Sequence, residues 1–519
     1  MPIRIVPDQP EKNSNRPSQN SNRSGSRRSS GGSPLLAALI GFLFKKPKLL
    51  IPILIIAALL YFGKGCLFSG DNASVVPDIA QLFTGAEFNE AEYDKAEVFE
   101  PLADNIKNPL PEKVSLEEFC PDRKNQGKQG SCVGWSSGYA ARTILEARAT
   151  GKDPNQVAFS PASLYNQISL PNCQGAYIIN AMKTMKTTGL LPWSDLPYDE
   201  NTCDVELSRA GYQKAANYRM RGFNRLTPNG DPRGVDLLAI KQNLAQGAPV
   251  VIGMMVGGSF MTKMNGKESW RPYRSDYNMS GFGGHAMCVI GYDDYKNGGS
   301  FQIMNSWGEK WGRKGLAWVN YSDFKHFTKE AYGLYPMGNA NSAEPAQFKA
   351  SFGLIDQSNK QEIQLEKASS FYFRTKQAIP KLSKFKIEVT NNVACYTYIF
   401  GQETDQSSYV LFPYTKKHSP YCGITGTRQF PKDASLQADE IGQQDFFAIV
   451  ISREPLDYDK FNQMINGGRG SNYLQKIYNA FGNQIDNGAQ LGMNRGQISV
   501  VTDAQEEGLI VIVIGVDKR

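Results

Sequence analysis

Cys132 lies at the start of a predicted helix, a position that favours a nucleophilic thiol. The polar, glycine-bearing segment 125–131 leads into this cysteine and then into a helical pattern over 136–149. The free N–H groups and the dipole at a helix N-terminus favour a thiolate. Gln126, six residues before the cysteine, can bring an amide donor back toward the sulfur. A nucleophile with a nearby donor is the start of an acyl-transfer site.

The choice of a base for this thiol is narrow, because the chain has only three histidines, His285, His326 and His418. His285 follows two glycines and opens an apolar run typical of a buried strand, whereas the other two lie in polar surroundings typical of exposed residues. Asn305 ends the next predicted strand, where its amide oxygen can orient an imidazole, and Trp307 can shield that bond from water. Each residue alone has a structural explanation, and their joint occurrence predicts a catalytic site.

The positive charge of the chain belongs to its N-terminal part. The net charge is +7, and residues 1–48 carry nine Lys/Arg and two acids, 9 − 2 = +7, which leaves 48 against 48 for the rest. Because the folded part has no net positive charge, its electrostatics give no reason to expect nucleic-acid binding. The 519 residues predict two domains with extra segments, and eight cysteines allow only a few bridges. No pattern predicts a cofactor or a metal.

The N-terminal segments predict a membrane anchor. Residues 1–33 are polar and predict a disordered cytoplasmic tail. Residues 34–68 contain two apolar runs, 35–44 and 49–62, and predict an anchor region with a spanning helix at about 49–66. Lysines before the second run and acids after it predict a cytoplasmic N-terminus and an extracytoplasmic catalytic domain, in the periplasm or at the cell surface. The alternative is a cleaved signal peptide and secretion. Residues 69–114 predict a stalk.

The remaining chain predicts an α+β fold in two domains. Residues 115–337 change from helical to strand patterns, and residues 346–519 predict a mainly-β, sandwich-like domain with one helical insertion. In the first domain the predicted helices are 136–149, 160–166, 176–187 and 235–246, and the predicted strands are 249–256, 286–291, 300–304 and 316–319. In the second domain the predicted strands are 385–389, 395–400, 409–412, 446–451, 498–501 and 509–516, with a helical stretch at 458–480.

Four motifs together resemble the papain family of cysteine peptidases. In chain order they are Gln126-Gly127-Lys128-Gln129-Gly130-Ser131-Cys132, Cys173-Gln174-Gly175-Ala176-Tyr177, Gly284-His285-Ala286 and Asn305-Ser306-Trp307-Gly308. The resemblance covers roughly residues 115–335. It implies a helical lobe and a β-barrel-like lobe that meet at a cleft, and an enzyme of the thiol protease type, a hydrolase that needs no cofactor.

The resemblance also implies roles for single residues. Cys132, His285 and Asn305 would form the catalytic set that attacks a peptide or protein substrate, and Gln126 would stabilise the oxyanion. The residues implied in substrate binding are Gly175, Ala176, Gly284 and Trp307. The long helical propeptide of the family is not recognisable in residues 69–119.

The chain departs from the family at one position that bears on disulfides. Gln129 replaces the cysteine that usually precedes the nucleophile, so Cys173 lacks its usual partner. Cys120 is the favoured substitute, and Cys203 is the alternative. Within the C-terminal domain, Cys395 and Cys422 are candidates for a further bridge.

The sequence leaves three functions open. The C-terminal domain resembles an uncharacterised bacterial β-rich module, which brings no chemistry and implies a protein or glycan partner. The first hypothesis is a membrane-anchored, extracytoplasmic cysteine peptidase. The second is a catalytically idle peptide-binding or adhesion scaffold. The third is a transpeptidase or amide-transfer enzyme that uses the same acyl-enzyme.

Overall fold

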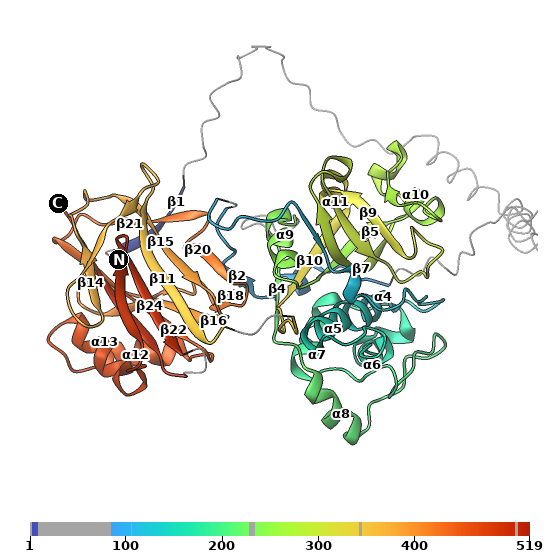
Figure 1. The fold of residues 1–519 in the computed structure, drawn as a ribbon, viewed down its shortest axis with the longest axis horizontal. Helices are drawn as coiled ribbons and strands as arrows, with labels where there is room; N and C mark the ends of the chain where they lie inside the picture. Colours follow the sequence, from blue (N-terminus) through green and yellow to red (C-terminus); the bar gives the residue numbers. More distant parts are fainter. Residues whose placement is uncertain (1–2, 9–84, 105, 228–233, 342–344, 504–506) are drawn as a thin grey trace, which may run out of the picture. The chain divides into compact units, whose positions relative to one another are not determined.

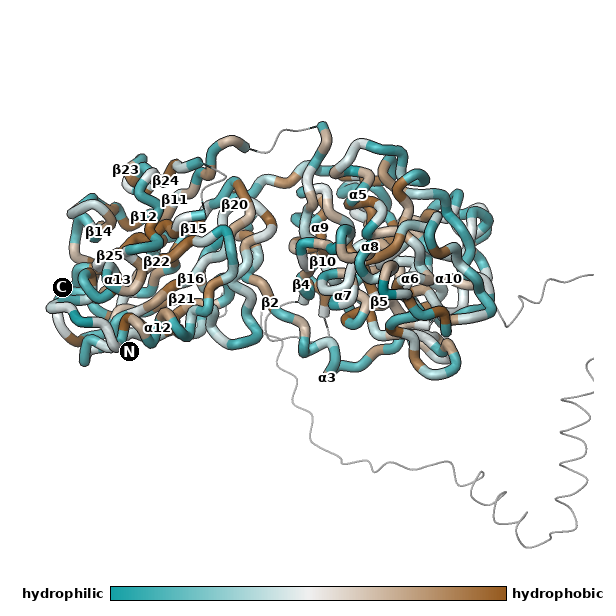
Figure 2. The backbone as a smooth tube through the Cα atoms, turned by 90° about the horizontal axis from the view of Figure 1, so that it is seen from below, coloured by the Kyte–Doolittle hydropathy of each residue, from teal (hydrophilic) through white to brown (hydrophobic). Residues whose placement is uncertain are grey.

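The structure, a computed structural model, describes residues 3–8, 85–104, 106–227, 234–341, 345–503 and 507–519 (Figure 1). These residues build a mixed α/β domain and a β-rich domain, each with its own hydrophobic core. The apolar segments concentrate inside each domain, while most peripheral loops are hydrophilic (Figure 2). The predicted α+β fold class agrees with these elements.

The first lobe of the α/β domain is organised around one long helix. Its parts α4 (Cys132–Gly134), η5 (Trp135–Arg142) and α5 (Thr143–Thr150) follow one another without a break. It ends at Gly151, which has a φ of 68° and takes the left-handed conformation that glycine tolerates best. The other helices of this lobe are α6 (Pro161–Ile168), α7 (Ile178–Thr187) and α8 (Arg209–Ala215). The three helices predicted here are therefore confirmed, with ends shifted by a few residues.

The second lobe is a mainly antiparallel sheet that places His285 in its middle. Its central strand β7 (Gly283–Asp293) pairs with β5 (Val250–Val256) and β8 (Ser300–Met304). The other elements of this lobe are β4 (Phe223–Arg225), α9 (Leu237–Ala245), β6 (Ser269–Trp270), β9 (Leu316–Asn320), α11 (Tyr321–Phe327) and β10 (Thr328–Leu334). The predicted strands are all present. The strand β10 was not predicted, although six of its seven residues are buried.

Residues 85–114 do not form the predicted stalk. They contain α3 (Glu90–Tyr93), β2 (Val98–Phe99) and β3 (Lys113–Ser115), and β3 pairs with β7. Tyr93 is buried against the ring of Tyr332, and Asp94 forms an ion pair with Arg225 at 2.6 Å. These contacts hold the segment on the domain. They depend on residues far away in the sequence, so the periodicity of the segment itself does not predict them.

The C-terminal domain is built from two sheets. The larger sheet has the order β1-β21-β15-β11-β24-β23, and the smaller has the order β13-β14-β25-β22-β16-β17. The strands of the larger sheet are β1 (Ile3–Pro7), β11 (Gln347–Asp356), β12 (Glu362–Ile363), β15 (Lys384–Asn391), β20 (Gly426–Phe430), β21 (Ala434–Ala438), β23 (Gln490–Asn494) and β24 (Gln497–Asp503). Those of the smaller sheet are β13 (Leu365–Lys367), β14 (Tyr372–Thr375), β16 (Cys395–Gln402), β17 (Ser408–Phe412), β19 (Tyr421–Cys422), β22 (Gln444–Ser452) and β25 (Ile510–Asp517).

Strand alternation divides the smaller sheet between two cores. In β25, Ile512 and Ile514 belong to the core shared by the two sheets, while Val511 and Val513 face a second core. Side chains along a strand point to opposite faces in turn, so a sheet that is apolar at every position must be covered twice. Helices α12 (Tyr458–Gly467) and α13 (Tyr473–Phe481) supply residues of the second core, which explains the helical insertion.

The N-terminal predictions receive two different outcomes. Residues 3–7, predicted to be disordered, form strand β1 because Ile3 is buried and pairs with β21. The predicted span at about 49–66 lies outside the described residues. In the described part of the chain, no helix is long and apolar enough to cross a membrane.

Candidate active site

Cys132 is the first residue of the long helix and is fully buried. Its sulfur accepts a hydrogen bond at 3.3 Å from the backbone N–H of Ala286, the residue after His285. The two predicted motifs, 154 residues apart in the chain, therefore meet where the helix start of one lobe touches the central strand of the other. Burial raises the pKa of the Cys132 thiol to about 12, and the nearby Glu87 carboxylate adds to this effect.

The imidazole of His285 is held by the loop after β8. Its Nε2 lies 2.7 Å from Oδ1 of Asn305, and that oxygen also accepts the backbone N–H of Ser306 at 2.7 Å. Because an atom that accepts from a backbone N–H must be the amide oxygen, Nε2 of the histidine carries the proton. The Trp307 ring stacks on the imidazole with 4.5 Å between centroids. The predicted histidine, asparagine and tryptophan thus lie together.

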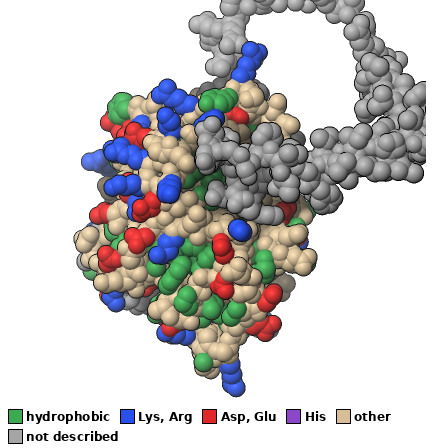
Figure 3. Space-filling model, turned by 90° about the vertical axis from the view of Figure 1, so that its right-hand side faces the viewer, with side chains coloured by type: hydrophobic (Ala, Val, Ile, Leu, Met, Phe, Trp, Pro, Cys, Tyr) green, Lys and Arg blue, Asp and Glu red, His purple; other side chains and the backbone are tan. Residues whose placement is uncertain are grey.

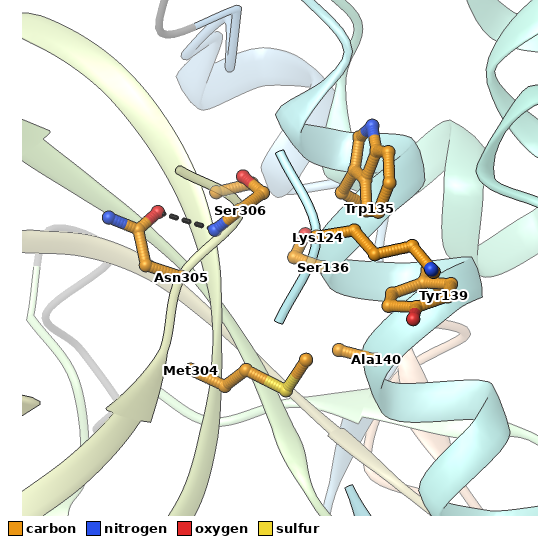
Figure 4. Close-up of a pocket in the computed structure, with 9 residues that line it drawn as sticks. Lys124, Trp135, Ser136, Tyr139, Ala140, Met304, Asn305 and Ser306 are labelled. Carbon is orange, nitrogen blue, oxygen red and sulfur yellow. Dashed lines mark hydrogen bonds between the residues drawn. The ribbon is translucent and has the colours of Figure 1, made fainter. Parts of the chain in front are cut away.

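Behind this loop lies a small pocket between the lobes (Figure 4). Trp135 and Tyr139 line it from the long helix, and Asn305 and Ser306 line it from the loop. The dashed line in Figure 4 marks the Ser306 hydrogen bond that fixes the Asn305 amide. The pocket shows how closely the helix side chains approach the loop that orients the histidine.

Gln126 is fixed beside the nucleophile. Its Oε1 accepts the Ser306 hydroxyl at 2.6 Å, and its Nε2 donates to the Gln129 carbonyl at 2.9 Å. The Gln129 carbonyl can only accept, so its bond assigns the nitrogen end of the side chain, and the donor end faces the turn that carries Cys132. This is the orientation that an oxyanion donor requires.

Residues Gly85–Phe88, here called the strap, pair with the residues predicted to bind substrate. The N–H of Ala86 donates to the Gly284 carbonyl at 3.0 Å, and the N–H of Glu87 donates to the Ala176 carbonyl at 3.1 Å. In turn, the N–H of Ala176 donates to the Gly85 carbonyl at 2.9 Å. The sites predicted for a substrate backbone are therefore used by the chain itself.

Phe88 fills a recess next to these hydrogen bonds. A Cβ atom at Gly253 would lie 2.4 Å from the Phe88 ring, and one at Gly284 would lie 2.7 Å from it. Since atoms cannot approach this closely, the absence of side chains at both glycines makes room for the ring. The recess is thus shaped for a large apolar side chain.

Segment 198–203 supports the nucleophile turn. The sequence analysis did not predict this role. The Tyr198 hydroxyl lies 2.6 Å from the Ser131 hydroxyl and donates to the Gln126 carbonyl at 2.7 Å. The Gln129 amide donates to the Thr202 carbonyl at 2.8 Å. Gln129 therefore ties the turn by a hydrogen bond where the family uses a disulfide. Only the isolated Cys203 marked this segment in the sequence.

The disulfide next to this segment joins Cys173 to Cys203. The favoured pairing of Cys173 with Cys120 is wrong, because Cys120 is a buried free thiol. Its sulfur donates to the backbone carbonyl of Leu116 at 3.4 Å. Cys395 and Cys422 are cross-strand partners in the C-terminal domain, and both are free thiols.

Removing this disulfide is expected to destabilise the protein without touching the catalytic residues. For the double variant Cys173→Ala/Cys203→Ala, the sequence separation of 30 implies a loss of roughly 3–4 kcal/mol from the free energy of unfolding. Urea titration of the full chain measures the loss. Reductant should lower the wild-type midpoint and leave that of the variant unchanged, and an equal response of both would contradict the assignment.

The surface of the protein carries charged side chains of both signs. On the face drawn in Figure 3, Lys and Arg lie among Asp and Glu. Within the described ranges, no group of three or more His, Cys, Asp or Glu side chains is arranged to hold a metal ion.

This arrangement, with the thiol on a helix of one lobe and the imidazole on a sheet of the other, defines the class of two-lobed cysteine peptidases. Residues 111–337 match the family described as papain family cysteine protease. The likeness to papain-family cysteine proteases therefore lies in residues 111–337 of the 519-residue chain.

Several known proteins are similar to part of this chain. An uncharacterized peptidase C1-like protein of Acanthamoeba polyphaga mimivirus is 31% identical over 199 residues, which are 37% of this chain and 61% of that protein. Cathepsin K of Mus musculus is 29% identical over 199 residues, which are 54% of its length. Among solved structures, xylellain, a cysteine protease from Xylella fastidiosa, is 20% identical with a TM-score of 0.40, over 49% of this chain and 96% of xylellain. The chain thus spans less than two thirds of the curated relatives named here.

Proposed function

We propose that the protein hydrolyses peptide bonds in peptide or protein substrates through a thioester at Cys132. The observation that carries this proposal is the meeting of the two lobes, where the residue after His285 donates to the Cys132 sulfur and His285 itself is held by Asn305. A cysteine peptidase needs these groups in one place, and the family match of residues 111–337 supports the same reading.

The expected reaction follows from the proton positions. Nδ1 of His285 takes the thiol proton as sulfur attacks the substrate carbonyl, and the oxyanion is stabilised by Gln126 and the backbone N–H of Cys132. The imidazolium then protonates the leaving amine, and the carbon–nitrogen bond breaks. Water, deprotonated by His285, hydrolyses the thioester and restores the thiol. Asn305 holds the imidazole in the tautomer that both steps need.

Gln126→Ala is expected to lower kcat by about 10²–10³-fold with little change in KM, because an oxyanion donor acts in the transition state. Steady-state kinetics on a fluorogenic peptide measures it. Gln126→Glu keeps the size of the side chain and replaces the donor by an acceptor, so it should lose as much. Normal activity of either variant would remove Gln126 from this role.

The strap holds the described chain in a closed state. It uses the backbone groups of Ala176 and Gly284 that a substrate would need, and its Phe88 fills the adjacent recess. A substrate therefore competes with the strap, and the recess favours a substrate with a large apolar side chain at that position. Activity is expected once the strap is displaced or cleaved.

Labelling by an epoxysuccinyl peptide tests the function directly. The probe should modify Cys132 in a chain cleaved after the strap, and His285→Ala should block the modification while the fold is kept. Modification together with cleavage of a peptide library supports a peptidase. Modification with transfer to an added amine, and no hydrolysis, would indicate the amide-transfer enzyme. A site that neither labels nor cleaves would indicate the idle scaffold.

We place this activity in an oxidising, extracytoplasmic compartment. The Cys173–Cys203 disulfide supports this location, because structural disulfides are rare in the cytosol. The proposal predicts that both cysteines resist alkylation in protein taken directly from cells, until reductant is added.

A further inference from the structure

Strand β1 completes the edge of the larger sheet in the C-terminal domain. Residues Ile3–Pro7 pair antiparallel with Ala434–Ala438 of β21, in a register that runs from Ile3↔Ala438 to Pro7↔Ala434. An open edge strand exposes unpaired N–H and C=O groups, and β1 supplies their partners along the whole of β21. The first residues of the protein thus belong to the fold of its last domain.

Side chains hold β1 in this register. Ile3 is 1% exposed and is a member of the core between the two sheets. The Tyr409 hydroxyl donates to the Ile3 carbonyl at 2.6 Å. After the strand, Asp8 accepts the Ser435 hydroxyl and forms a 3.0 Å ion pair with Lys386, whose side chain is 6% exposed. The buried Ile3 at one end and the ion pair of Asp8 with the nearly buried Lys386 at the other specify this strand.

The position of β1 constrains the segment that follows it. The apolar runs at 35–44 and 49–62 lie between β1 and every other described element. Paired strands lie about 4.8 Å apart, whereas a bilayer core is about 30 Å thick. One crossing by this segment would put β1 and β21 on opposite sides. If β1 pairs with β21 of the same chain, the segment between them therefore cannot cross the membrane once only.

The connection is long enough to return. Residues 9–84 give 84 − 8 = 76 residues between Asp8 and the strap. At roughly 3.3 Å per extended residue, the reach is far longer than a bilayer is thick. Chain length thus permits an excursion to a membrane and back to the same side.

We propose that the N-terminal strand β1 and the C-terminal domain lie in one compartment, on the same side of any membrane. The edge of β21 is then the binding site for the chain's own residues 3–8. This inference does not rest on the proposed peptidase activity, since all of its contacts lie in the C-terminal domain.

Cross-linking in the full chain tests the pairing. Arg4 and Gln437 are cross-strand partners, so oxidation of Arg4→Cys/Gln437→Cys should give an intramolecular disulfide between peptides containing residues 4 and 437. The matched control is Arg4→Cys/Gln490→Cys, because Gln490 lies on β23 at the opposite edge of the same sheet. Absence of the 4–437 bond, equal bonding in the control, or a bond between two chains would overturn the proposal.

Protease accessibility in intact cells tests the compartment. One protease site is placed near residue 20 and another after residue 519, and each is combined with the cross-linkable cysteine pair. Both sites are expected to be cleaved by external protease, or both protected until the membrane is opened. Cleavage at one site and protection at the other would overturn the shared compartment, whatever the peptidase activity of the chain.

Discussion

Cys132→Ser is expected to reduce kcat/KM for peptide cleavage by roughly 10⁴-fold or more, measured in a chain whose strap has been displaced. Serine keeps the size of the side chain and loses the thiol. An alkyl hydroxyl has a much higher pKa than a thiol, so under the proposed mechanism His285 cannot activate it to the same extent. Circular dichroism and the urea midpoint should stay at the wild-type values, because a hydroxyl can also accept the hydrogen bond that the sulfur accepts from the N–H of Ala286.

Cys120→Ser is the matched control. Cys120 is also buried and free, and burial raises the pKa of its thiol to about 12, as it does for Cys132. It has no contact with His285 or Asn305 among the hydrogen bonds described. Full activity of Cys120→Ser with inactive Cys132→Ser identifies the nucleophile. Comparable losses in both variants would mean that the activity reports on a buried thiol in general.

Gly85→Ala is expected to open the cleft. Gly85 has a φ of +77°, and a Cβ there would lie 2.1 Å from the Gly130 carbonyl oxygen, so the strap must leave its position. A non-glycine residue in this conformation costs about 1–3 kcal/mol, and 1.4 kcal/mol corresponds to tenfold in an equilibrium. The alkylation rate of Cys132 and the rate of peptide cleavage should therefore rise by about tenfold or more.

The same variant should change the pH dependence of alkylation. Burial raises the pKa of Cys132 to about 12 when the strap is in place, so the thiol is neutral at pH 8. Solvent entry removes much of the burial and takes the Glu87 carboxylate away. Both changes favour the thiolate. The alkylation rate of Cys132 should therefore begin to rise at a lower pH in Gly85→Ala than in the wild type.

Gly298→Ala controls for backbone strain alone. Gly298 has a φ of +79°, close to that of Gly85, but a Cβ there meets nothing within 4 Å. It should leave both the labelling rate and its pH profile unchanged. A Gly85→Ala chain that behaves like Gly298→Ala would show that the strap does not restrict the site.

The sequence predicts the chemistry of the site better than its supports. Cys132, His285 and Asn305 stand out because their types are scarce or lie in patterned segments, and the structure brings the last two within 2.7 Å. Tyr198 and Thr202 carry no such signal, since a hydroxyl and a backbone carbonyl in a loop resemble any others. Their roles depend on which loop lies beside the nucleophile turn, and that is a property of tertiary packing.

The fold shows the same division. Helices with capping residues and closing glycines were predicted to within a few residues, because these signals are local. Strand β1 and the strap were missed, since a short strand is defined by its partner rather than by its own sequence. Residues 3–7 alternate too briefly to stand out, and Gly85–Phe88 has no period at all.

The order of these parts along the chain has a consequence for synthesis. The sulfur of Cys132 meets its partner N–H only after 154 further residues, and the loop with Asn305 follows later still. Contacts at such separations form late in folding, and a nascent chain carries the thiol without its base while the 153 residues from Val133 to His285 are made. The strap precedes all of these residues. Whenever the last catalytic group emerges from the ribosome, the segment that covers the cleft has already been made, and the chain passes through no stage at which the assembled site lacks its cover.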